Sequence, residues 1–529
     1  MSSEDIIDAL ALTAKLMELH DENSFKTKAL ANAAFRLSKL RYTFEGRSKE
    51  ELIALDGVGK SIGDKIWVML ETGSYPELTA LIEKTPAGVI ELLGIKGLGP
   101  KKVRQLWQEL QIESPGELLY ACNENRLVTL KGFGDKTQAQ VKQALEFNEA
   151  NRHKFHYATL VPYVHQWIEA LRQEGKEVVV TGQMARQLET IDEVEVLVEE
   201  GVHIAIPSDF PVHVSIHSAA KADFGRRQLE LSAAPEHLRQ IQFDTLQPNE
   251  IATEHIAYEK LRLPYIVAEL REGLGEVELA KAQSLPELIT VNDLKGTLHN
   301  HTTWSDGVHT LAEMAAQCVE NGLTYFGVCD HSRSAFYANG LSEERVLAQH
   351  KEIDALNATF TGFKILKGIE SDILGDGQLD YSEAILKTFD FVVASVHSNL
   401  RMSEEKATAR LIKAIENPYT SILGHPTGRL LLARPGYPID HKKVIDACAA
   451  NGVSIELNAH PYRLDIDWRW IPYCREKGVL IAINPDAHHK DGLKDMQWGV
   501  VAARKGRLTK EGCLNARGLP ELLQTFNKL

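Results

Sequence analysis

Residues 293–307 read Asp-Leu-Lys-Gly-Thr-Leu-His-Asn-His-Thr-Thr-Trp-Ser-Asp-Gly, a short apolar strand that runs into a polar loop. Side chains two positions apart lie on the same face of a strand, so His299 and His301 point in one direction, and Asp306 can reach back towards them from the loop. Imidazole and carboxylate groups gathered at the end of a strand predict a metal site.

Further side chains able to bind metal follow other apolar, strand-like runs. Phe-Val-Val-Ala-Ser-Val-His ends at His397, and Val-Leu-Ile-Ala-Ile-Asn-Pro-Asp-Ala-His ends at His488. Amphipathic helices are expected between the strands, for example over residues 311–321, 342–358 and 441–451. This alternation over about 240 residues predicts a (β/α) barrel with its ligands at one end, and hence a multinuclear metal hydrolase. The predicted ligands are His299, His301, Asp306, His331, Glu370, His397, His425, Asp486 and His488.

Each of these side chains also has a simpler interpretation. A lone buried histidine is more often a hydrogen-bonded residue than a ligand, and Asp330 or Asp372 can cap a helix or orient a ligand imidazole. The order of the nine side chains and their common place at strand ends favour metal binding for the whole set.

Length and composition predict a multidomain protein of α and α/β structure. A chain of 529 residues is too long for one hydrophobic core, so two to four domains are expected. With 44% hydrophobic and 25% charged residues, every part is expected to fold. No opening apolar run resembles a signal peptide, and no uncharged stretch reaches the ~18 residues of a membrane span, so we expect a cytoplasmic protein without membrane contact.

Cysteine usage and charge narrow the possible functions. The six cysteines form no Cys-x-x-Cys pair, which fits a reducing compartment and argues against a disulfide framework and a thiolate zinc site. A formal net charge of -14 is not that of a general nucleic-acid binder. Any contact with DNA must therefore be local.

One short pattern recurs three times in the first third of the chain. Leu-Asp-Gly-Val-Gly-Lys (55–60), Ile-Lys-Gly-Leu-Gly-Pro (95–100) and Leu-Lys-Gly-Phe-Gly-Asp (130–135) each precede a helical segment and resemble a helix-hairpin-helix repeat. The glycines allow a tight turn that brings backbone N–H groups close to a DNA phosphate. An ordinary helical hairpin is the alternative, above all for the lysine-poor third copy. The predicted DNA contacts are Gly57, Gly59, Lys60, Gly97, Gly99, Lys101, Gly132 and Gly134.

The order of these parts resembles the bacterial family X DNA polymerases that carry a C-terminal PHP (polymerase and histidinol phosphatase) domain. The resemblance covers essentially the whole chain and is strongest over residues 263–307 and 422–432. It implies a helical helix-hairpin-helix N-terminal region, an α+β nucleotidyltransferase-like palm and a distorted (β/α)7 PHP barrel. The implied domains are a lyase-like hairpin domain (1–85), a fingers-like hairpin domain (86–150), a degenerate palm (151–240), a thumb remnant and linker (241–290) and a PHP phosphoesterase domain (291–529).

The palm departs from the family pattern at the positions that perform polymerase chemistry. Family members have a Gly-Ser followed by two arginines and an Asp-x-Asp pair, and the matching stretch runs without gaps over residues 182–198. The residues at these positions are Gly182, Gln183 for the serine, Ala185 for the first arginine, Arg186 as the second, Glu193 and Glu195 for the two aspartates, and Ser215 for a third family aspartate.

These replacements predict a palm that is retained as a structure but silent as a polymerase. Mg²⁺ requires near-octahedral oxygen ligands at about 2.0–2.1 Å, and two-metal phosphoryl transfer requires ions about 3.5–4 Å apart. Glu193 and Glu195 are each one methylene longer than aspartate, and Ser215 lacks the charge of the third ligand. A surviving polymerase activity that uses both glutamates with a substitute ligand is the alternative.

Lys65 falls where some family members place an amine that forms a Schiff base with the sugar of an abasic site. Such an amine becomes reactive only through burial or neighbouring cations. A phosphate-contacting or solvated helix lysine is the alternative interpretation of Lys65.

The PHP resemblance implies three divalent ions. Imidazole and carboxylate ligands without thiolates suit Mn²⁺, Zn²⁺ or Fe²⁺, and because PHP relatives often work best with manganese, Mn²⁺ is the expected metal. The implied groups are His299, His301, Glu370 and Asp486 for one ion, Glu370, His397 and His425 for the second, and Asp306, His331 and His488 for the third.

Together, the two halves of the chain predict a metal-dependent enzyme that processes DNA 3′ ends in DNA repair. We expect a monomeric 3′–5′ exonuclease, with 3′-phosphatase or abasic-site endonuclease action as variants, on gapped, nicked or 3′-end DNA. The alternatives are a working family X polymerase whose PHP domain proofreads, a small-molecule phosphatase of the histidinol-phosphate type, and a non-catalytic DNA-binding scaffold. Arg333, Arg429 and Arg463 are candidate phosphate clamps, and a surface salt bridge is the alternative interpretation of each. The expected catalytic residues are His299, His301, Glu370, Asp486 and Arg429.

Overall fold

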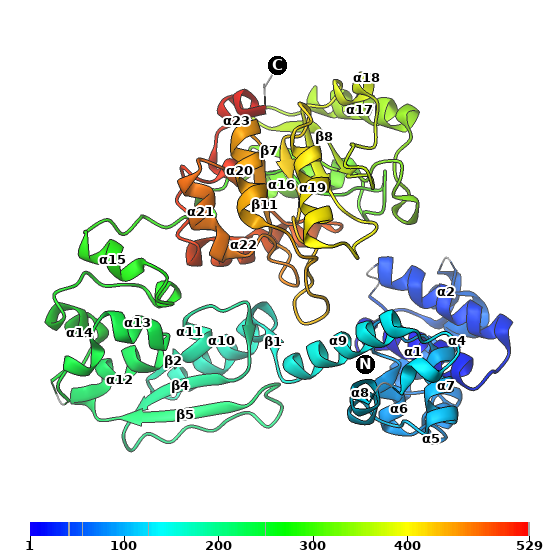
Figure 1. Ribbon diagram of the computed structural model, residues 1–529, viewed down its shortest axis with the longest axis horizontal. Helices are drawn as coiled ribbons and strands as arrows, with labels where there is room; N and C mark the ends of the chain where they lie inside the picture. Colours follow the sequence, from blue (N-terminus) through cyan, green and yellow to red (C-terminus); the bar gives the residue numbers. More distant parts are fainter. Residues whose placement is uncertain (41–42, 56, 125, 249, 527–529) are drawn as a thin grey trace. The chain divides into compact units, whose positions relative to one another are not determined.

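The computed structural model describes residues 1–529 apart from 41–42, 56, 125, 249 and 527–529. The chain forms two compact units, Met1–Arg152 and His153–Leu529. The first unit is helical, and the second combines a small sheet with a parallel barrel (Figure 1). The predicted combination of a helical N-terminal region, an α+β palm and a seven-stranded barrel is confirmed. Among the described residues, no helix has the length and apolar content that a membrane crossing requires.

Short sequence signals mark where helices of the first unit begin. Ser2 and Asp5 form a capping box at the start of α1, and Ser48 and Glu51 form another at the start of α3. The apolar faces of the helices share one buried cluster. The helices are α1 (Ser3–Leu19), α2 (Ser24–Leu40), α3 (Lys49–Ala54), α4 (Gly59–Thr72), α5 (Pro76–Glu83), α6 (Ala87–Leu92), α7 (Pro100–Leu110), α8 (Pro115–Asn123) and α9 (Asp135–Asn151).

A three-stranded sheet forms the centre of the palm. Its strands lie in the order β2, β4, β5, with β2 antiparallel and β5 parallel to β4. Helix α10 contributes Trp167 and Leu171 to the apolar cluster of this sheet, and a separate apolar cluster joins the helices that follow it. The elements are β1 (Phe155–His156), α10 (Tyr157–Gln173), β2 (Val178–Thr181), α11 (Gly182–Ala185), β3 (Thr190–Ile191), β4 (Val194–Glu199), β5 (Val214–Ala219), α12 (Phe224–Leu231), α13 (Pro235–Gln240), α14 (Glu254–Lys260) and α15 (Glu276–Lys281).

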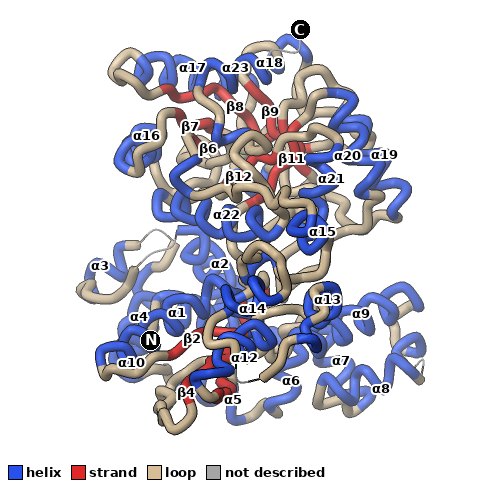
Figure 2. The backbone as a smooth tube through the Cα atoms, turned by 90° about the vertical axis from the view of Figure 1, so that its left-hand side faces the viewer, coloured by secondary structure: helices blue, strands red, loops and turns tan. Residues whose placement is uncertain are grey.

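Seven parallel strands form the barrel in chain order, and a parallel bridge between Asn300 and Ala487 brings the two ends of the sheet together. The strands are almost entirely buried, so they read as apolar runs without alternation. Helices surround them (Figure 2). Helices α16, α17 and α20 confirm those predicted over 311–321, 342–358 and 441–451. The elements are β6 (Gly296–Thr297), α16 (Leu311–Glu320), β7 (Tyr325–Val328), α17 (Glu343–Asn357), β8 (Lys364–Asp372), α18 (Glu383–Leu386), β9 (Phe391–Ser395), α19 (Glu404–Ile415), β10 (Ile422–Leu423), α20 (His441–Asn451), β11 (Ser454–Asn458), α21 (Ile471–Glu476), β12 (Ile481–Asn484), α22 (Met496–Lys505) and α23 (Leu519–Phe526).

A buried lysine joins the palm region to the barrel. The ammonium of Lys505 donates to the carbonyl oxygens of Arg186 and Glu269 at 2.7 and 3.1 Å. It also donates to the Glu272 carboxylate at 2.9 Å and lies 4.7 Å from the centre of the Trp468 ring. Arg186 donates to the same Glu272 carboxylate at 3.0 Å. Arg186, predicted to be the arginine retained from the family pattern, is therefore part of a structural contact with the barrel.

Candidate active site at the mouth of the barrel

The predicted metal ligands lie together at the carboxyl ends of the barrel strands. His299 and His301 follow β6, and the bridge between Asn300 and Ala487 brings the end of β12 beside them. Because the strands are parallel, their ends meet at one mouth. The other ligands are Asp306 in the loop after β6, His331 after β7, Glu370 within β8, His397 after β9, His425 after β10, and Asp486 and His488 after β12.

These side chains form four groups, and within each group the ligand atoms lie within 4.8 Å of one another. Together the groups contain all nine predicted ligands, and each group shares one residue with the next, so they form a closed ring. The family resemblance implied three sets of ligands, whereas the structure divides the same nine side chains into four overlapping groups. The groups are His301, Asp306, His331 and His488; His299, His301 and Asp486; His299, Glu370 and His425; and His331, Glu370 and His397.

Several buried atoms of this ring have no well-formed hydrogen bond to any described residue. They include Nε2 of His299, Nδ1 of His331 and Oε2 of Glu370. Yet His331 Nδ1 lies 2.9 Å from Glu370 Oε2, and His299 Nε2 lies 3.3 Å from Glu370 Oε1. Buried polar atoms are nearly always hydrogen bonded, and a cation between such atoms would satisfy them. The side chains therefore fit divalent metal ions held by nitrogen and oxygen ligands.

Burial and neighbouring charges set the ionisation of the ligands. Burial opposes ionisation of Glu370, but the positive charge of the protonated His397 side chain, whose own pKa is raised to about 10, helps to hold the pKa of Glu370 well below the ordinary value. Burial, together with His488 and His331, lowers the pKa of His301 to about 3. At neutral pH Glu370 is therefore an anion and His301 a neutral imidazole, which are the forms that bind a metal cation. The pKa values of His299 and His397 are raised by neighbouring carboxylates despite burial, so a bound cation would have to displace their protons.

Two buried aspartates support the ligands from behind. Asp372 lies 2.5 Å from Nδ1 of His397 and so directs the other ring nitrogen towards the mouth. Asp330 accepts hydrogen bonds from the backbone N–H and the hydroxyl of Thr302, at 2.8 and 2.7 Å, and holds the loop that carries Asp306. The contact of Asp372 corresponds to the orienting role considered from the sequence. The hydrogen bonds of Asp330 go to Thr302, Ser305 and Gln349, so Asp330 holds the loop and not a ligand imidazole.

Glu456 is a further orienting residue that the sequence reasoning missed. It is completely buried in β11, and its Oε2 lies 2.7 Å from Nδ1 of His299 and 3.0 Å from Nδ2 of Asn484. Its other oxygen accepts hydrogen bonds from the backbone N–H of His425 and from Asn458 Nδ2, at 3.2 and 3.1 Å. One carboxylate thus orients two predicted ligands. A lone acidic residue inside a buried strand is the signal that could have revealed it, because a buried charge requires partners.

The candidate phosphate clamps have different surroundings. Arg463 Nε lies 3.9 Å from Oδ2 of Asp486, at the edge of the ligand ring. Arg429 donates to the Asp467 carboxylate at 2.7 Å and to the Arg463 carbonyl at 2.9 Å. A third donor of Arg429 binds the carbonyl of Leu464. Arg429 thereby holds the loop that presents Arg463, and its expected catalytic role stays a prediction.

The three hairpin turns share one backbone geometry. The first glycine of each has a positive φ, 76° at Gly57, 93° at Gly97 and 88° at Gly132, a region that glycine adopts without steric cost. The residue between the two glycines is buried, whereas the glycines are exposed. The turns are therefore anchored in the core and open to solvent where the next helix begins. The buried middle residues are Val58, Leu98 and Phe133.

In the first two turns, an exposed lysine lies close after the second glycine. Lys60 and Lys101, which follow Gly59 and Gly99, are both exposed. Exposed lysines next to open backbone N–H groups form a surface that suits phosphate. Contact of these residues with DNA stays a prediction. Asp56, in the first hairpin motif, lies outside the described residues.

Lys65 lies on α4 and is engaged by neighbouring residues. Its ammonium forms a salt bridge with Glu77 and lies 4.8 Å from the centre of the Tyr75 ring. A pocket of about 610 Å³ adjoins these three side chains. An amine held in this way would have to leave its ion pair before it could act as a nucleophile, and its lyase role stays a prediction.

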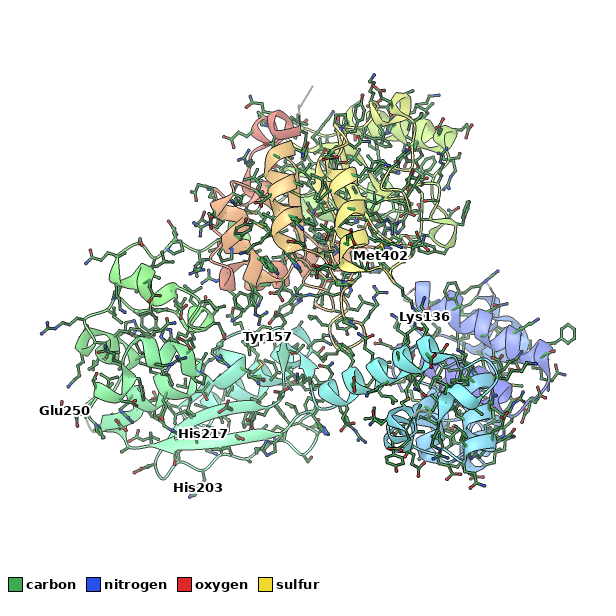
Figure 3. The ribbon with its side chains drawn as sticks, in the orientation of Figure 1. Lys136, Tyr157, His203, His217, Glu250 and Met402 are labelled. Atoms are coloured by element: carbon green, nitrogen blue, oxygen red, sulfur yellow. The ribbon has the colours of Figure 1, made fainter. Side chains whose placement is uncertain are left out.

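The palm brings its replaced polymerase residues together but pairs them with neighbours. Ser215 lies opposite Glu195 in the β4–β5 register, and its hydroxyl donates to the Glu193 carboxylate at 2.7 Å. Glu195 lies 3.0 Å from Nε2 of His217, which is labelled in Figure 3. Its Oε1 also occupies the space above Gly182, where an added Cβ would lie only 2.1 Å away. Within the described part of the chain, side-chain groups suited to hold a metal occur in the barrel and not in the palm.

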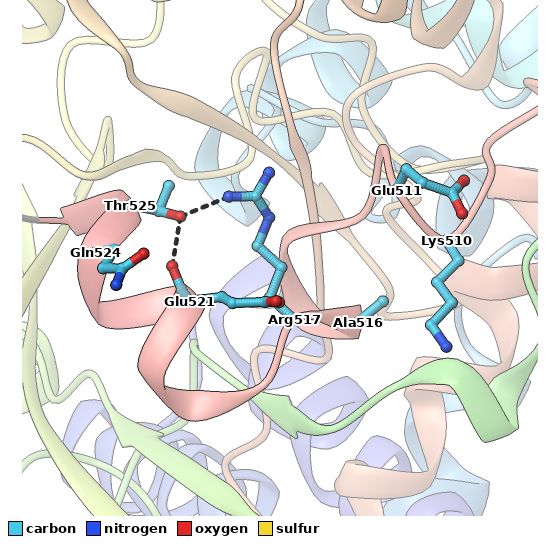
Figure 4. Close-up of a pocket in the computed structure, with 7 residues that line it drawn as sticks. All are labelled: Lys510, Glu511, Ala516, Arg517, Glu521, Gln524 and Thr525. Atoms are coloured by element: carbon cyan, nitrogen blue, oxygen red, sulfur yellow. Dashed lines mark hydrogen bonds between the residues drawn. The ribbon is translucent and has the colours of Figure 1, made fainter.

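A surface pocket beside the C-terminal helix α23 does not coincide with the ligand ring (Figure 4). Its volume is about 600 Å³, and Arg517 there donates to the hydroxyl of Thr525 at 2.7 Å. The described residues that line it include none of the predicted ligands. In this molecule the chemistry of the side chains, rather than the depth of a hollow, identifies the candidate site.

Similarities to known proteins agree with this arrangement. Residues 1–75 match a helix-hairpin-helix domain, residues 89–146 match a SAM-like helix-hairpin-helix tandem, and residues 297–460 match a PHP domain. The chain is 33% identical to the DNA polymerase/3′-5′ exonuclease PolX of Bacillus subtilis (strain 168), over 99% of this chain and 99% of the relative. The chain belongs to the PolX family. The resemblance to family X polymerases with a PHP domain is thereby confirmed.

Other relatives of this PolX-family chain match a smaller part of it. A probable phosphatase of Acetivibrio thermocellus is 31% identical over 36% of this chain and 78% of its own length. A probable phosphatase of Thermoanaerobacter sp. (strain X514) is 30% identical over 41% of this chain and 88% of its own length. Phosphatase relatives therefore share only part of the architecture, whereas the Bacillus subtilis relative shares nearly all of it.

Proposed function

We propose that this PolX-family chain is a metal-dependent phosphodiesterase that removes nucleotides from DNA 3′ ends in DNA repair, and that its palm has lost polymerase activity. The observation that carries the proposal is the contrast between two sites. Nine ligand side chains form linked groups at the barrel mouth, whereas the palm carboxylates are paired with a serine and a histidine. The name of the Bacillus subtilis relative, which includes 3′-5′ exonuclease, supports the substrate and the direction of cutting.

Divalent ions in the ring, with Mn²⁺ as the proposed metal, would supply Lewis-acid activation of water and of the phosphate ester. Glu370 and Arg463 contribute to the arrangement in which such ions would be bound and a phosphate oriented. Oε1 of Glu370 lies 3.0 Å from Nε2 of His425 and 3.1 Å from Nε2 of His397, so one carboxylate can serve neighbouring groups. Arg463, beside Asp486, places a positive charge where a phosphate oxygen can be oriented.

The hairpins supply the DNA contact that the composition does not. A chain with a net charge of -14 repels DNA as a whole. Exposed glycine turns with Lys60 and Lys101 beside them support a local grip on the DNA backbone that does not read its sequence. This favours a polymeric DNA substrate over a small phosphate ester.

The side-chain pairs of the palm support the loss of polymerase activity. The Glu193 carboxylate is bound by Ser215, and the Glu195 carboxylate lies against His217. Arg186 donates to Glu272 and contributes to the contact with the barrel. Arg186, Glu193 and Glu195 therefore each have a protein partner, which an incoming metal ion or nucleotide would have to displace.

The test uses one duplex labelled at the 5′ end and the same duplex labelled at the 3′ end, incubated with the full-length protein and Mn²⁺. A 3′–5′ exonuclease yields a ladder from the 5′ label and mononucleotides from the 3′ label. The double variant His299→Ala, His301→Ala should yield neither. A phosphatase of the histidinol-phosphate type would instead cleave only phosphomonoesters, and a DNA-binding scaffold would leave both duplexes intact.

Polymerase activity is tested separately in the His299→Ala, His301→Ala background, so that nuclease action cannot hide it. We expect no extension of a primed or gapped template with all four nucleotides and either Mg²⁺ or Mn²⁺. Extension that disappears when Glu193→Ala is added would show that the palm is active and would overturn this part of the proposal.

A further inference from the structure

The loop that follows β7 carries two exposed aromatic residues in succession, and the second lies beside a candidate metal ligand. Its tip is a short 3-10 turn (Phe336–Ala338), in which Phe336 is 88% exposed and Tyr337 is 58% exposed. The centre of the Tyr337 ring lies 6.1 Å from that of His331, a predicted ligand. An aromatic side chain exposed to this extent contributes little to the stability of the fold, so its place at the mouth points to a binding role.

Hydrogen bonds at the base of this loop hold its tip in place. The backbone N–H of Leu341 donates to the carbonyl of His331 at 2.9 Å and closes the loop. The Ser334 hydroxyl donates to Asp372 at 2.7 Å, and Asp372 is the carboxylate that orients a ligand imidazole. The backbone N–H of Ser334 also donates to Asp380, at 2.6 Å. The tip is therefore a fixed part of the mouth, tied to the scaffold of the ligand ring.

We propose that Phe336 and Tyr337 form a stacking platform for the terminal nucleobase of the strand that is cut. This inference rests on the proposed exonuclease function and names residues that position its substrate. Aromatic rings stack on any base, because every base has a π face, and such contacts add affinity without reading sequence.

The charge of the mouth makes such a platform useful. The ring contains the carboxylates of Asp306, Glu370 and Asp486, which repel a phosphate until cations neutralise them. Stacking does not depend on those charges and holds the end of the strand by its base. A base that is stacked on protein cannot be stacked in a duplex, so a frayed or single-stranded end is accepted with less cost than a paired one.

The platform is tested with two single strands that differ only at the 3′-terminal nucleotide, which carries either a base or an abasic tetrahydrofuran. The intact protein with Mn²⁺ should remove the base-bearing nucleotide about tenfold faster at limiting DNA concentration. In the double variant Phe336→Ala, Tyr337→Ala this ratio should fall to about one. Phe336→Tyr keeps an aromatic ring and should retain the preference, as should Leu347→Ala, which changes an exposed apolar residue on α17. A ratio that the double variant leaves unchanged would overturn the platform.

A binding measurement separates failure of the platform from failure of the proposed function. Full-length His299→Ala, His301→Ala protein is titrated with a strand that carries 2-aminopurine at its 3′ end, whose fluorescence is quenched by stacking. We expect quenching that disappears when Phe336→Ala and Tyr337→Ala are added, although the hairpins still hold the strand. If the intact protein cuts neither strand, the exonuclease proposal fails while the quenching result still decides the platform. Quenching that persists in the four-residue variant would refute the platform.

Discussion

Glu456→Gln is expected to weaken metal binding while the barrel stays folded. Glutamine has nearly the same size as glutamate, but it carries no charge and presents an NH₂ group where one oxygen now accepts hydrogen bonds. In the structure Glu456 accepts from the side chains of Asn484 and Asn458 and lies 2.7 Å from Nδ1 of His299. The variant therefore loses a charge-assisted bond to a ligand imidazole and leaves one donor without an acceptor.

The size of the effect follows from that bond. A hydrogen bond to a charged group contributes about 1.5–3 kcal/mol, and about 1.4 kcal/mol corresponds to a factor of ten in affinity. We therefore expect about 10- to 100-fold weaker Mn²⁺ binding, the range typical of changes to the partners of ligand histidines. Saturating Mn²⁺ should restore much of the rate of DNA degradation, because the ligands themselves are unchanged.

The assay is a chelator-competition titration of Mn²⁺ into the full-length protein, with bound metal measured after gel filtration. Glu405→Gln, which changes an exposed carboxylate on α19, is the matched control. Thermal unfolding in the presence of a chelator shows whether each variant is folded before metal is added. An affinity within about threefold of the parent protein would refute the reasoning that Glu456 orients His299 for binding.

Three other predictions concern the scaffold and the hairpins. Lys505→Met removes a buried ammonium that donates to two carbonyls and a carboxylate. The free energy of unfolding of the second unit, measured with urea, should therefore fall by about 3 kcal/mol. A decrease below about 1 kcal/mol would contradict the role of Lys505 in joining the palm region to the barrel. Gly97→Ala should lower the stability of the second hairpin by about 1–2 kcal/mol because φ is 93°. Gly99→Ala, at a φ of -79° with open space around it, should cost only about 0.5 kcal/mol, the lower end of the cost of alanine at an N-cap. Hydrogen exchange of α6 and α7 measures both, and equal effects would exclude backbone strain as the cause. Lys60→Gln should weaken DNA binding uniformly across sequences and reduce the slope of log affinity against log salt by about one, and an unchanged slope would remove Lys60 from the phosphate contacts.

The barrel could be predicted from the sequence because its signals are local. Apolar runs that end in His299, His397 or His488 show both the buried strands and the position of the ligands at their carboxyl ends. Helix α20 begins and ends at the predicted residues, His441 and Asn451. Each of these signals depends on neighbours along the chain, so no knowledge of distant contacts was needed.

The contacts behind the ligands could not be predicted in the same way. Glu456 and His299 are 157 positions apart, and Asp372 and His397 are 25 positions apart. Closure of the barrel brings Glu456 of β11 to His299 after β6, and the parallel pairing of β8 with β9 brings Asp372 to His397. The ring arrangement of the ligand groups has the same origin, since His301 faces both Asp486 and the group that contains Asp306.

In the palm, too, the residue types could be predicted from the sequence, whereas their contacts could not. The family resemblance predicts that Glu193, Glu195 and Ser215 stand in place of three aspartates, but it does not predict the partners of these side chains. The structure pairs Glu195 with His217 on the adjacent strand. It also places Arg186 in contact with Glu272, a residue from a different segment of the chain.

Sequence alone determined the types of element in this protein, their order and the identity of the side chains able to hold metal, because period, turn chemistry and residue type are properties of short segments. Tertiary structure decided which of those side chains can share a cation position, which carboxylates orient them, and that the Tyr337 ring lies beside His331. Those features depend on distances between segments far apart in the chain, and such distances exist only after the barrel has closed and its loops have been tied to it.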